Sequence, residues 1–431
     1  MKKVPGILLL LITSITYSQD RLTLQDAVSI ALKNSLGIKI AKTNVAISNA
    51  NNSYGMAGGL PSVTFTGSDQ EQTSNLNQTL NGGTEIARTG VSNNSATLGV
   101  AANMLVYNGG RVVAAKKRLT TVEEQTQQQL SSRGLIVATN VILKYYDIVR
   151  QQSFAESLEK NIDFSKQKLD IVKAQQSVGV ANNADLFQAQ LDLNNQLQAL
   201  QAQELVIDQG KTDLLAMLTL KTDSTLTIRD SIIIDKSLKL DSVLNNLDYN
   251  PDIIAANKQI NINQYLETEV GAQRYPTLSL GGGLSYARSQ SSAGNVMFNQ
   301  NYGPYVGVNL SLPIYNGSIF KRQEKVATLN TVNAASVRDT LVLNYQATAV
   351  KSWQGYLSNM KQLETQQKNY DLAVQLLDLI IKKFQLRQAT IVDVRQAQQT
   401  FELSAYTLTN ISYNAKSSEI VLKRLMNKLT Y

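Results

Sequence analysis

Two long tracts without proline constrain this chain more than any other feature of its sequence. Residues 111–250 and 316–431 contain no proline and are rich in Ala, Leu, Gln, Lys and Glu, with few glycines. This is the composition of long α-helices. Both tracts are far longer than an ordinary globular helix, so the sequence predicts long helices that turn back on themselves. Proline after the N-terminal segment is confined to Pro61, Pro251, Pro276, Pro304 and Pro313.

The two tracts follow one plan. Tyr107 and the residues after it correspond to Tyr315 and its successors, an offset of 208 residues (315 − 107 = 208) that continues without a gap. Apolar residues recur every seven positions in both copies, and a sustained heptad period predicts helices that supercoil against neighbours. These positions are Leu186, Leu193, Leu200, Ile207 and Leu214 in one copy and Val394, Phe401, Leu408, Ala415 and Leu422 in the other.

Each copy also contains two segments in which apolar residues alternate, which predicts half-exposed β-strands. They span about 61–75 and 95–107 in the first copy and about 276–288 and 303–314 in the second. Polar, glycine-containing segments between them, Asp69–Asn94 and Ser289–Tyr302, are typical of loops. Because the smallest membrane barrels have about eight strands, four strands could line a membrane pore only if several chains pooled them.

The N-terminus has the layout of a secretory signal peptide, with Lys2 and Lys3 before a short apolar run. No later stretch reaches the roughly 20 apolar residues of a membrane helix, so membrane passage would require a closed β-barrel. We therefore expect four parts: a signal peptide (1–18); a first structural repeat (19–220) whose helical hairpin spans about 111–218 with its tip near 178–183; an equatorial linker (221–248); and a second repeat (249–431) whose hairpin spans about 318–430 with its tip near 385–391.

The chain contains neither cysteine nor histidine. It therefore lacks disulfides, thiolate and imidazole metal ligands, and the commonest catalytic base. We expect no enzyme activity, cofactor or metal site. The net charge of +8 is spread along the chain, which indicates a solvated surface and no nucleic-acid partner.

The sequence resembles the TolC, or outer membrane efflux protein, family over most of its length. The residues that carry the resemblance are Leu22–Asn34, Asn250-Pro251-Asp252-Ile253 and the two predicted tips, Val178–Gln190 and Ala389–Gln398. The resemblance implies a mainly α, α+β fold in which long antiparallel hairpins form a trimeric α-barrel tunnel and four strands per protomer join a shared 12-stranded transmembrane β-barrel. It also implies a location in the outer membrane of a Gram-negative cell, with the helices in the periplasm.

The resemblance further implies a channel subunit of a tripartite efflux or type I secretion system, a homotrimer in outer-membrane lipid that works with a periplasmic adaptor and an inner-membrane pump. Adaptor docking falls on Val178, Gly179 and Val180 at the first tip and on Leu386, Arg387 and Gln388 at the second. The second tip departs from the usual Val-Gly pair. A periplasmic gate falls on Asp393 and Asp185, while Gln396 stands where the family often has a second acidic residue.

Other interpretations remain open at this stage. Asp185 and Asp393 could simply cap helices and complement their dipoles. An exported trimeric coiled-coil adhesin or structural fibre would also combine heptads, strands and a signal peptide. The sequence does not discriminate among drugs, lipids, metal ions and polypeptides as cargo.

Overall fold

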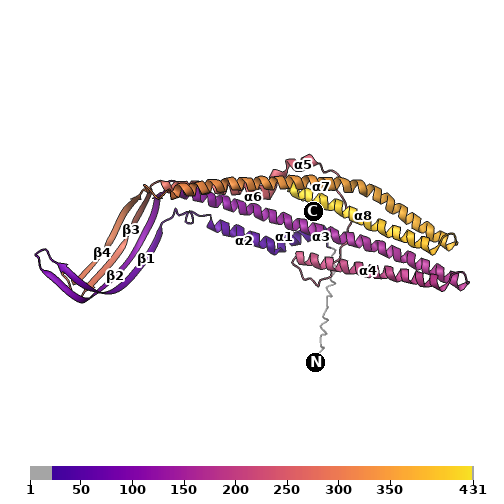
Figure 1. Cartoon of the computed structure of the whole chain (residues 1–431), viewed down its shortest axis with the longest axis horizontal. Helices are drawn as coiled ribbons and strands as arrows, with labels where there is room; N and C mark the ends of the chain where they lie inside the picture. The colour runs from indigo at the N-terminus through magenta and orange to yellow at the C-terminus, as the bar shows by residue number, and fades with distance from the viewer. Residues whose placement is uncertain (1–21, 430–431) are drawn as a thin grey trace, which may run out of the picture. The chain divides into compact units, whose positions relative to one another are not determined.

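A computed structural model describes residues 22–429, so the predicted signal peptide lies outside the described residues. The fold is mainly helical with one four-stranded sheet, which confirms the predicted fold class (Figure 1). The elements are α1 (Leu24–Asn34), α2 (Leu36–Asn51), β1 (Ser62–Thr79), β2 (Glu85–Tyr107), α3 (Arg111–Ser177), α4 (Asn183–Met217), α5 (Leu240–Asn245), α6 (Pro251–Gly271), β3 (Thr277–Ser291), β4 (Phe298–Ser311), α7 (Ile319–Gln385) and α8 (Ile391–Leu425), with 3-10 helices at Leu247–Tyr249 and Ala272–Arg274.

The long helices keep the offset seen in the sequence. The bounds of α3 and α7 differ by 208 at both ends (319 − 111 and 385 − 177), and each helix has 67 residues. Those of α4 and α8 also differ by 208 (391 − 183 and 425 − 217), and each has 35 residues. Equivalent positions in the two hairpins can therefore be compared one by one.

The chain forms two compact units. One unit contains the described residues up to Ile40 together with Ser131–Pro251 and Val342 onward, and the other contains Ala41–Leu130 and Asp252–Leu341. Each unit takes segments from both copies of the plan. The division therefore differs from the two predicted structural repeats, whose boundaries stay predictions.

The four strands form an antiparallel sheet in the order β1-β2-β3-β4, within the second unit. The first pair is longer than the sequence predicts, because β1 and β2 continue through the segment expected as a loop and leave only residues 80–84 as a turn. Polar side chains bond across this extension, as where Asn94 Nδ2 donates to Asp69 Oδ1 at 2.9 Å. A strand that is polar on both faces lacks the alternation by which strands are recognised in a sequence.

The second pair also differs from the prediction at its ends. β4 begins at Phe298, inside the segment expected as a loop, and ends at Ser311, two residues before Pro313.

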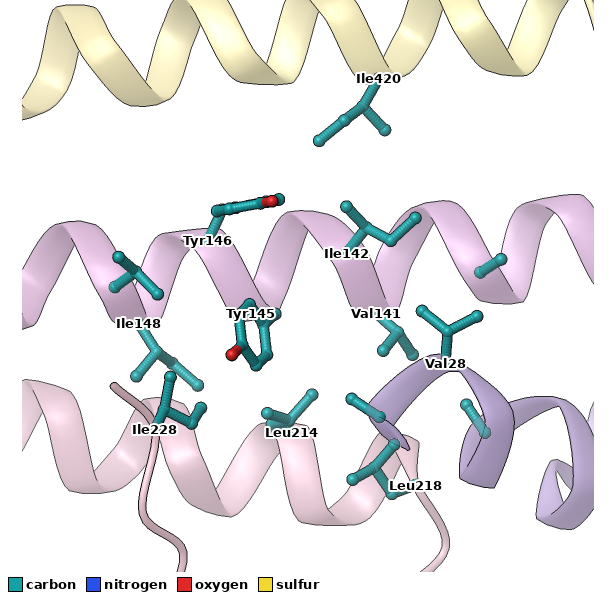
Figure 2. Close-up of a cluster of buried hydrophobic side chains, with 14 of the residues drawn as sticks. Val28, Val141, Ile142, Tyr145, Tyr146, Ile148, Leu214, Leu218, Ile228 and Ile420 are labelled. Carbon is teal, nitrogen blue, oxygen red and sulfur yellow. The ribbon is translucent and has the colours of Figure 1, made fainter. Parts of the chain in front are cut away.

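A hydrophobic core in the first unit lies where α1, α3 and α4 meet the linker after α4. Figure 2 shows Tyr145 of α3 near Leu214 of α4 and Ile228 of the linker. Tyr145 is 1% exposed, and its hydroxyl donates to Asp230 Oδ2 at 3.2 Å. The ring of Tyr145 packs against apolar side chains of this core, and its hydroxyl forms a hydrogen bond with the linker. Tyr145 therefore holds the linker against α3.

A buried ionic cluster holds the next part of the linker against α8. Glu419 is 1% exposed and accepts from Lys416 and Lys423, both at 2.9 Å, and from the backbone N–H of Asp235 at 2.9 Å. Lys423 also bonds Asp235 Oδ2 at 2.9 Å. Hydrogen bonds from Ser237 and Lys423 hold the pKa of Asp235 well below its usual range. Hydrogen bonds between charged groups are stronger than neutral ones, so the linker is held to α3 through Asp230 and to α8 through Asp235.

Candidate functional site

The first tip is a tight turn between α3 and α4. Gly179 has φ +77°, and the N–H of Val180 donates to the carbonyl of Gln175 at 2.9 Å. The N–H of Gly179 donates to Gln176 at 2.9 Å. This pattern is the Schellman motif, in which glycine takes a left-handed conformation at little cost.

The second tip repeats this turn with a different residue. Arg387 has φ +66°, at the position equivalent to Gly179 (179 + 208 = 387). The N–H of Gln388 donates to Lys383 at 2.8 Å and that of Arg387 to Phe384 at 3.1 Å. The departure from Val-Gly therefore changes the side chain and leaves the turn intact. A non-glycine residue in this conformation costs about 1 kcal/mol.

The side chains at both tips are open to solvent. Val178 is 67% exposed, Val180 49% and Leu386 68%, and Arg387 and Gln388 are exposed too. Apolar side chains on turns between helices favour contact with a partner. Adaptor docking at these residues stays a prediction.

Asp185 and Asp393 occupy the same place in α4 and α8, the third residue of the helix. Each completes a capping box with the residue before its helix, Asn182 or Thr390. Asp185 Oδ2 accepts from the N–H of Asn182 at 3.2 Å, and Asp393 Oδ2 accepts from that of Thr390 at 2.7 Å. Both aspartates thus have a structural role, satisfying amides that the helix leaves free.

The surroundings of Asp393 favour its charged form. Hydrogen bonds from the backbone and hydroxyl of Thr390 hold the pKa of Asp393 below its usual range. Gln396 is exposed one helical turn later, on the same face of α8. The structure thus places Asp393 and Gln396 side by side, while Asp185 holds the equivalent position on the other hairpin.

A buried lysine near the tips was not predicted from the sequence. Lys168 of α3 is 0% exposed, and its Nζ donates to Asp192 Oδ2 of α4 at 2.6 Å and to Gln398 Oε1 of α8 at 2.9 Å. Gln398 Nε2 in turn donates to Ser165 Oγ at 2.8 Å. Burial lowers the pKa of Lys168, and the hydrogen bond and charge of Asp192 oppose that shift. This network joins the first hairpin to α8, although a lone lysine in a helix is usually a solvated one.

The sheet has two unlike faces, because residues paired across strands share a face. On one face apolar side chains extend up to Tyr286 and Tyr302, and charged Asp69 and Arg288 lie in the next row. The other face carries no charge from Ser62 to Gln72 of β1 or at the positions paired with them on the other strands. The apolar face includes Val63, Phe65, Leu98, Val100, Leu284, Val306 and Val308, and the uncharged one Thr64, Thr66, Ser68, Thr97, Asn103, Ser285 and Asn301.

Within residues 22–429, none of the helices combines the length and the apolar character needed to cross a membrane. The same part of the chain contains no cluster of three or more acidic residues placed to hold a metal ion.

Comparison with known proteins identifies this arrangement. The family model described as outer membrane efflux protein matches residues 27–219 and 244–428, which is most of the chain. The chain belongs to the outer membrane efflux protein family. Both hairpins with their tips, and all four strands, fall within or between the matched segments of this efflux protein.

Individual relatives are distant in sequence and close in fold. Outer membrane protein TolC of Escherichia coli (strain K12) is 25% identical over 146 residues, which are 34% of this chain and 30% of TolC. The outer membrane protein VceC of Vibrio cholerae has a TM-score of 0.76 at 16% identity, covering 94% of this chain and 95% of VceC. The CmeC outer membrane channel of Campylobacter jejuni has a TM-score of 0.75 at 15% identity, covering 99% of this chain and 94% of CmeC. The efflux protein thus shares its fold with these proteins along nearly its whole length.

Proposed function

We propose that three copies of this efflux protein form a passive channel through the outer membrane, each contributing four strands to a 12-stranded barrel. The observation that carries this proposal is a four-stranded sheet with one apolar face, one uncharged polar face, and the free edges of β1 and β4. Free strand edges cannot be satisfied by lipid, so the sheet needs partners on both sides. Two further copies supply them.

The two faces of the sheet then have different neighbours. The apolar face meets lipid, with Tyr286 and Tyr302 at the boundary where aromatic residues gather in membrane barrels, and with Arg288 beyond it. The uncharged face lines the pore. A wall of Ser, Thr, Asn and Gly attracts neither sign of charge, so solutes are not sorted by charge in this section.

The helical hairpins lie on the periplasmic side in this proposal. Their tips, Val178-Gly179-Val180 and Leu386-Arg387-Gln388, dock on a periplasmic adaptor that connects the channel to an inner-membrane pump. Exposed apolar side chains at both turns support this assignment. Asp393, with Gln396 beside it and Asp185 on the other hairpin, forms the narrow periplasmic end.

Conductance in a planar lipid bilayer tests the proposal. Purified protein should give stable unitary currents, and an adhesin stalk or a structural fibre should give none. A preparation that binds lipid vesicles but never conducts would favour the fibre.

A further inference from the structure

Three polar side chains meet where α3, α4 and α8 pack against one another inside one chain. Asn161 of α3 is 0% exposed, and Gln196 of α4 and Glu402 of α8 are half-buried. Asn161 Nδ2 donates to Glu402 Oε2 at 3.2 Å, and Gln196 Nε2 donates to the same oxygen at 3.3 Å. One carboxylate oxygen therefore holds together amide groups from two other helices.

The carbonyl oxygens of both amides are buried and have no hydrogen-bond donor. These atoms are Asn161 Oδ1 and Gln196 Oε1. The oxygen and the nitrogen of one amide are only about 2 Å apart, so both oxygens lie within a few ångströms of the Glu402 carboxylate. Buried polar atoms are nearly always paired, and two unpaired oxygens in one place indicate a site for a ligand that accepts their lone pairs.

The same place carries a negative charge without a counter-charge. Lys168, two turns further along α3, is paired with Asp192 at 2.6 Å, so these two residues neutralise each other. Glu402 forms no ion pair with any lysine or arginine of residues 22–429, and its two hydrogen-bond donors are neutral. A water molecule would give the two oxygens hydrogen bonds and leave the charge unbalanced. A cation would satisfy the oxygens and balance the charge.

We propose that Asn161, Gln196 and Glu402 bind a calcium ion between α3, α4 and α8. Carboxylate and amide oxygens are the protein ligands that Ca²⁺ takes, with water completing a shell of flexible geometry. Mg²⁺ demands a near-ideal octahedron and gives up its own water reluctantly, so it fits between packed helices less well. The site uses oxygen alone and is therefore compatible with a chain that has neither cysteine nor histidine.

The second hairpin provides a comparison within the same chain. The positions equivalent to Asn161 and Gln196 are Asn369 and Ser404, and the position equivalent to Glu402 is Asn194 (161 + 208, 196 + 208 and 402 − 208). None of these three side chains is charged. The duplicated plan therefore contains this set of ligands once, and we expect one calcium ion per chain from it.

The composition of the site also sets its strength. The affinity of an oxygen site for Ca²⁺ rises with the number of charged ligands, and this site has only one carboxylate. We therefore expect a dissociation constant of about 0.1–1 mM, the range of extracellular calcium modules. The bound ion connects three helices of one chain, so its effect on stability does not depend on trimer formation or on conductance.

Calcium binding and thermal unfolding of the purified full-length chain in mild detergent test the proposal. After treatment with a chelator, binding is measured by equilibrium dialysis against radioactive calcium, and the unfolding midpoint by circular dichroism with and without millimolar calcium chloride. The unaltered chain should bind calcium and unfold at a higher temperature with it. Glu402→Gln should bind at least tenfold more weakly and lose this rise, while its midpoint without calcium is no lower than that of the unaltered chain.

The matched control is Glu364→Gln, which removes an exposed carboxylate of α7 and should leave the calcium effect unchanged. Asn161→Asp tests the site in the opposite direction, because it adds a second carboxylate with little change in shape. This variant should bind calcium at least tenfold more tightly than the unaltered chain and be less stable without it.

Two results would overturn the proposal. Equal calcium binding by the unaltered chain, Glu402→Gln and Asn161→Asp would mean that the three side chains do not hold the ion and that water alone fills the place. An equal rise of the midpoint with magnesium chloride, or with choline chloride at the same ionic strength, would remove the assignment to calcium. Either result leaves the proposed channel untouched, because conductance is not part of this test.

Discussion

At the scale of single residues, the two tips have the same turn but different residues in its left-handed position. Gly179→Val should lower the free energy of unfolding by about 1–2 kcal/mol, because a β-branched residue is strained at positive φ. Arg387→Gly should raise the free energy of unfolding by about 0.5–1 kcal/mol, because the strain of a side chain at positive φ is removed. The greater entropy of glycine in the unfolded chain offsets part of this gain. Guanidinium unfolding followed by circular dichroism measures both. Changes of the same sign would mean that the Arg387 side chain itself stabilises its turn.

The Gly179 variant also tests the tip as a docking site. Gly179→Val should still insert and conduct, because the turn lies outside the sheet, while efflux by the assembled system falls. Adaptor pull-down and an efflux assay measure this. Normal binding and normal efflux would remove the first tip from the docking surface.

Asp393 caps α8, and its charge is proposed to act at the narrow end of the channel. A substitution that removes only the charge tests the second role. Asp393→Asn keeps the size of the side chain and removes its charge, so a trimer with this residue at its narrow end should lose cation selectivity and divalent block. Reversal potentials in a salt gradient measure the change, with Asp163→Asn, which removes an exposed carboxylate of α3, as control. An unchanged reversal potential would leave Asp393 with its capping role only.

The pH dependence of the capping role of Asp393 follows from its lowered pKa. A carboxylate whose pKa is lower in the folded state stabilises that state above its unfolded pKa, and the contribution is lost as pH falls through the lowered value. Asp393→Asn should therefore show a shallower loss of stability than the unaltered chain as the pH falls below the ordinary pKa of an aspartate. Three carboxylates close together in a trimer would oppose this shift, because repulsion raises their apparent pKa. Unfolding at several acidic pH values compares the two chains.

At the scale of helices, the buried Lys168–Asp192 pair connects α3 and α4 beside α8. Lys168→Leu should cost about 3 kcal/mol, because Asp192 would remain as an unpaired, mostly buried charge. Adding Asp192→Thr should recover most of that loss, since Leu376 and Thr400 occupy the equivalent positions of the second hairpin. Denaturant unfolding compares the single and the double variant.

The control for this pair is Lys166→Leu, in which an exposed lysine next to Asp163 is removed. Its effect should stay within about 0.5 kcal/mol, as for other exposed ion pairs. A double variant no more stable than Lys168→Leu would mean that the network is held by Gln398 and Ser165 instead of the ion pair.

At the scale of the whole molecule, the proposed trimer can be tested through the edge strands of the sheet, β1 and β4. Native mass spectrometry in mild detergent should show a trimer as the conducting species, because the edges of β1 and β4 require strands from other copies. A stable, conducting monomer would contradict the channel proposed here.

The helices and the duplicated plan could be predicted from the sequence, because proline-free tracts indicate long helices and heptads indicate the face of each helix that packs against a neighbour. The polar extensions of β1 and β2 could not, since their hydrogen-bonding partners lie in the neighbouring strand. Lys168 was missed for the same reason: its partners Asp192 and Gln398 lie 24 and 230 residues away. For the tips, docking at the named residues stays a prediction from the sequence. The structure adds that Arg387 keeps the same turn at the second tip that Gly179 makes at the first.

The helices α3 and α7 have the same length, 67 residues each. Removing one heptad from α3 alone would shorten that helix by about 10 Å and leave its partner unchanged. The two tips would then no longer reach the same depth, and every contact between equivalent positions would be displaced. A deletion in α3 would therefore keep the two hairpins equally long only if α7 lost the same number of residues.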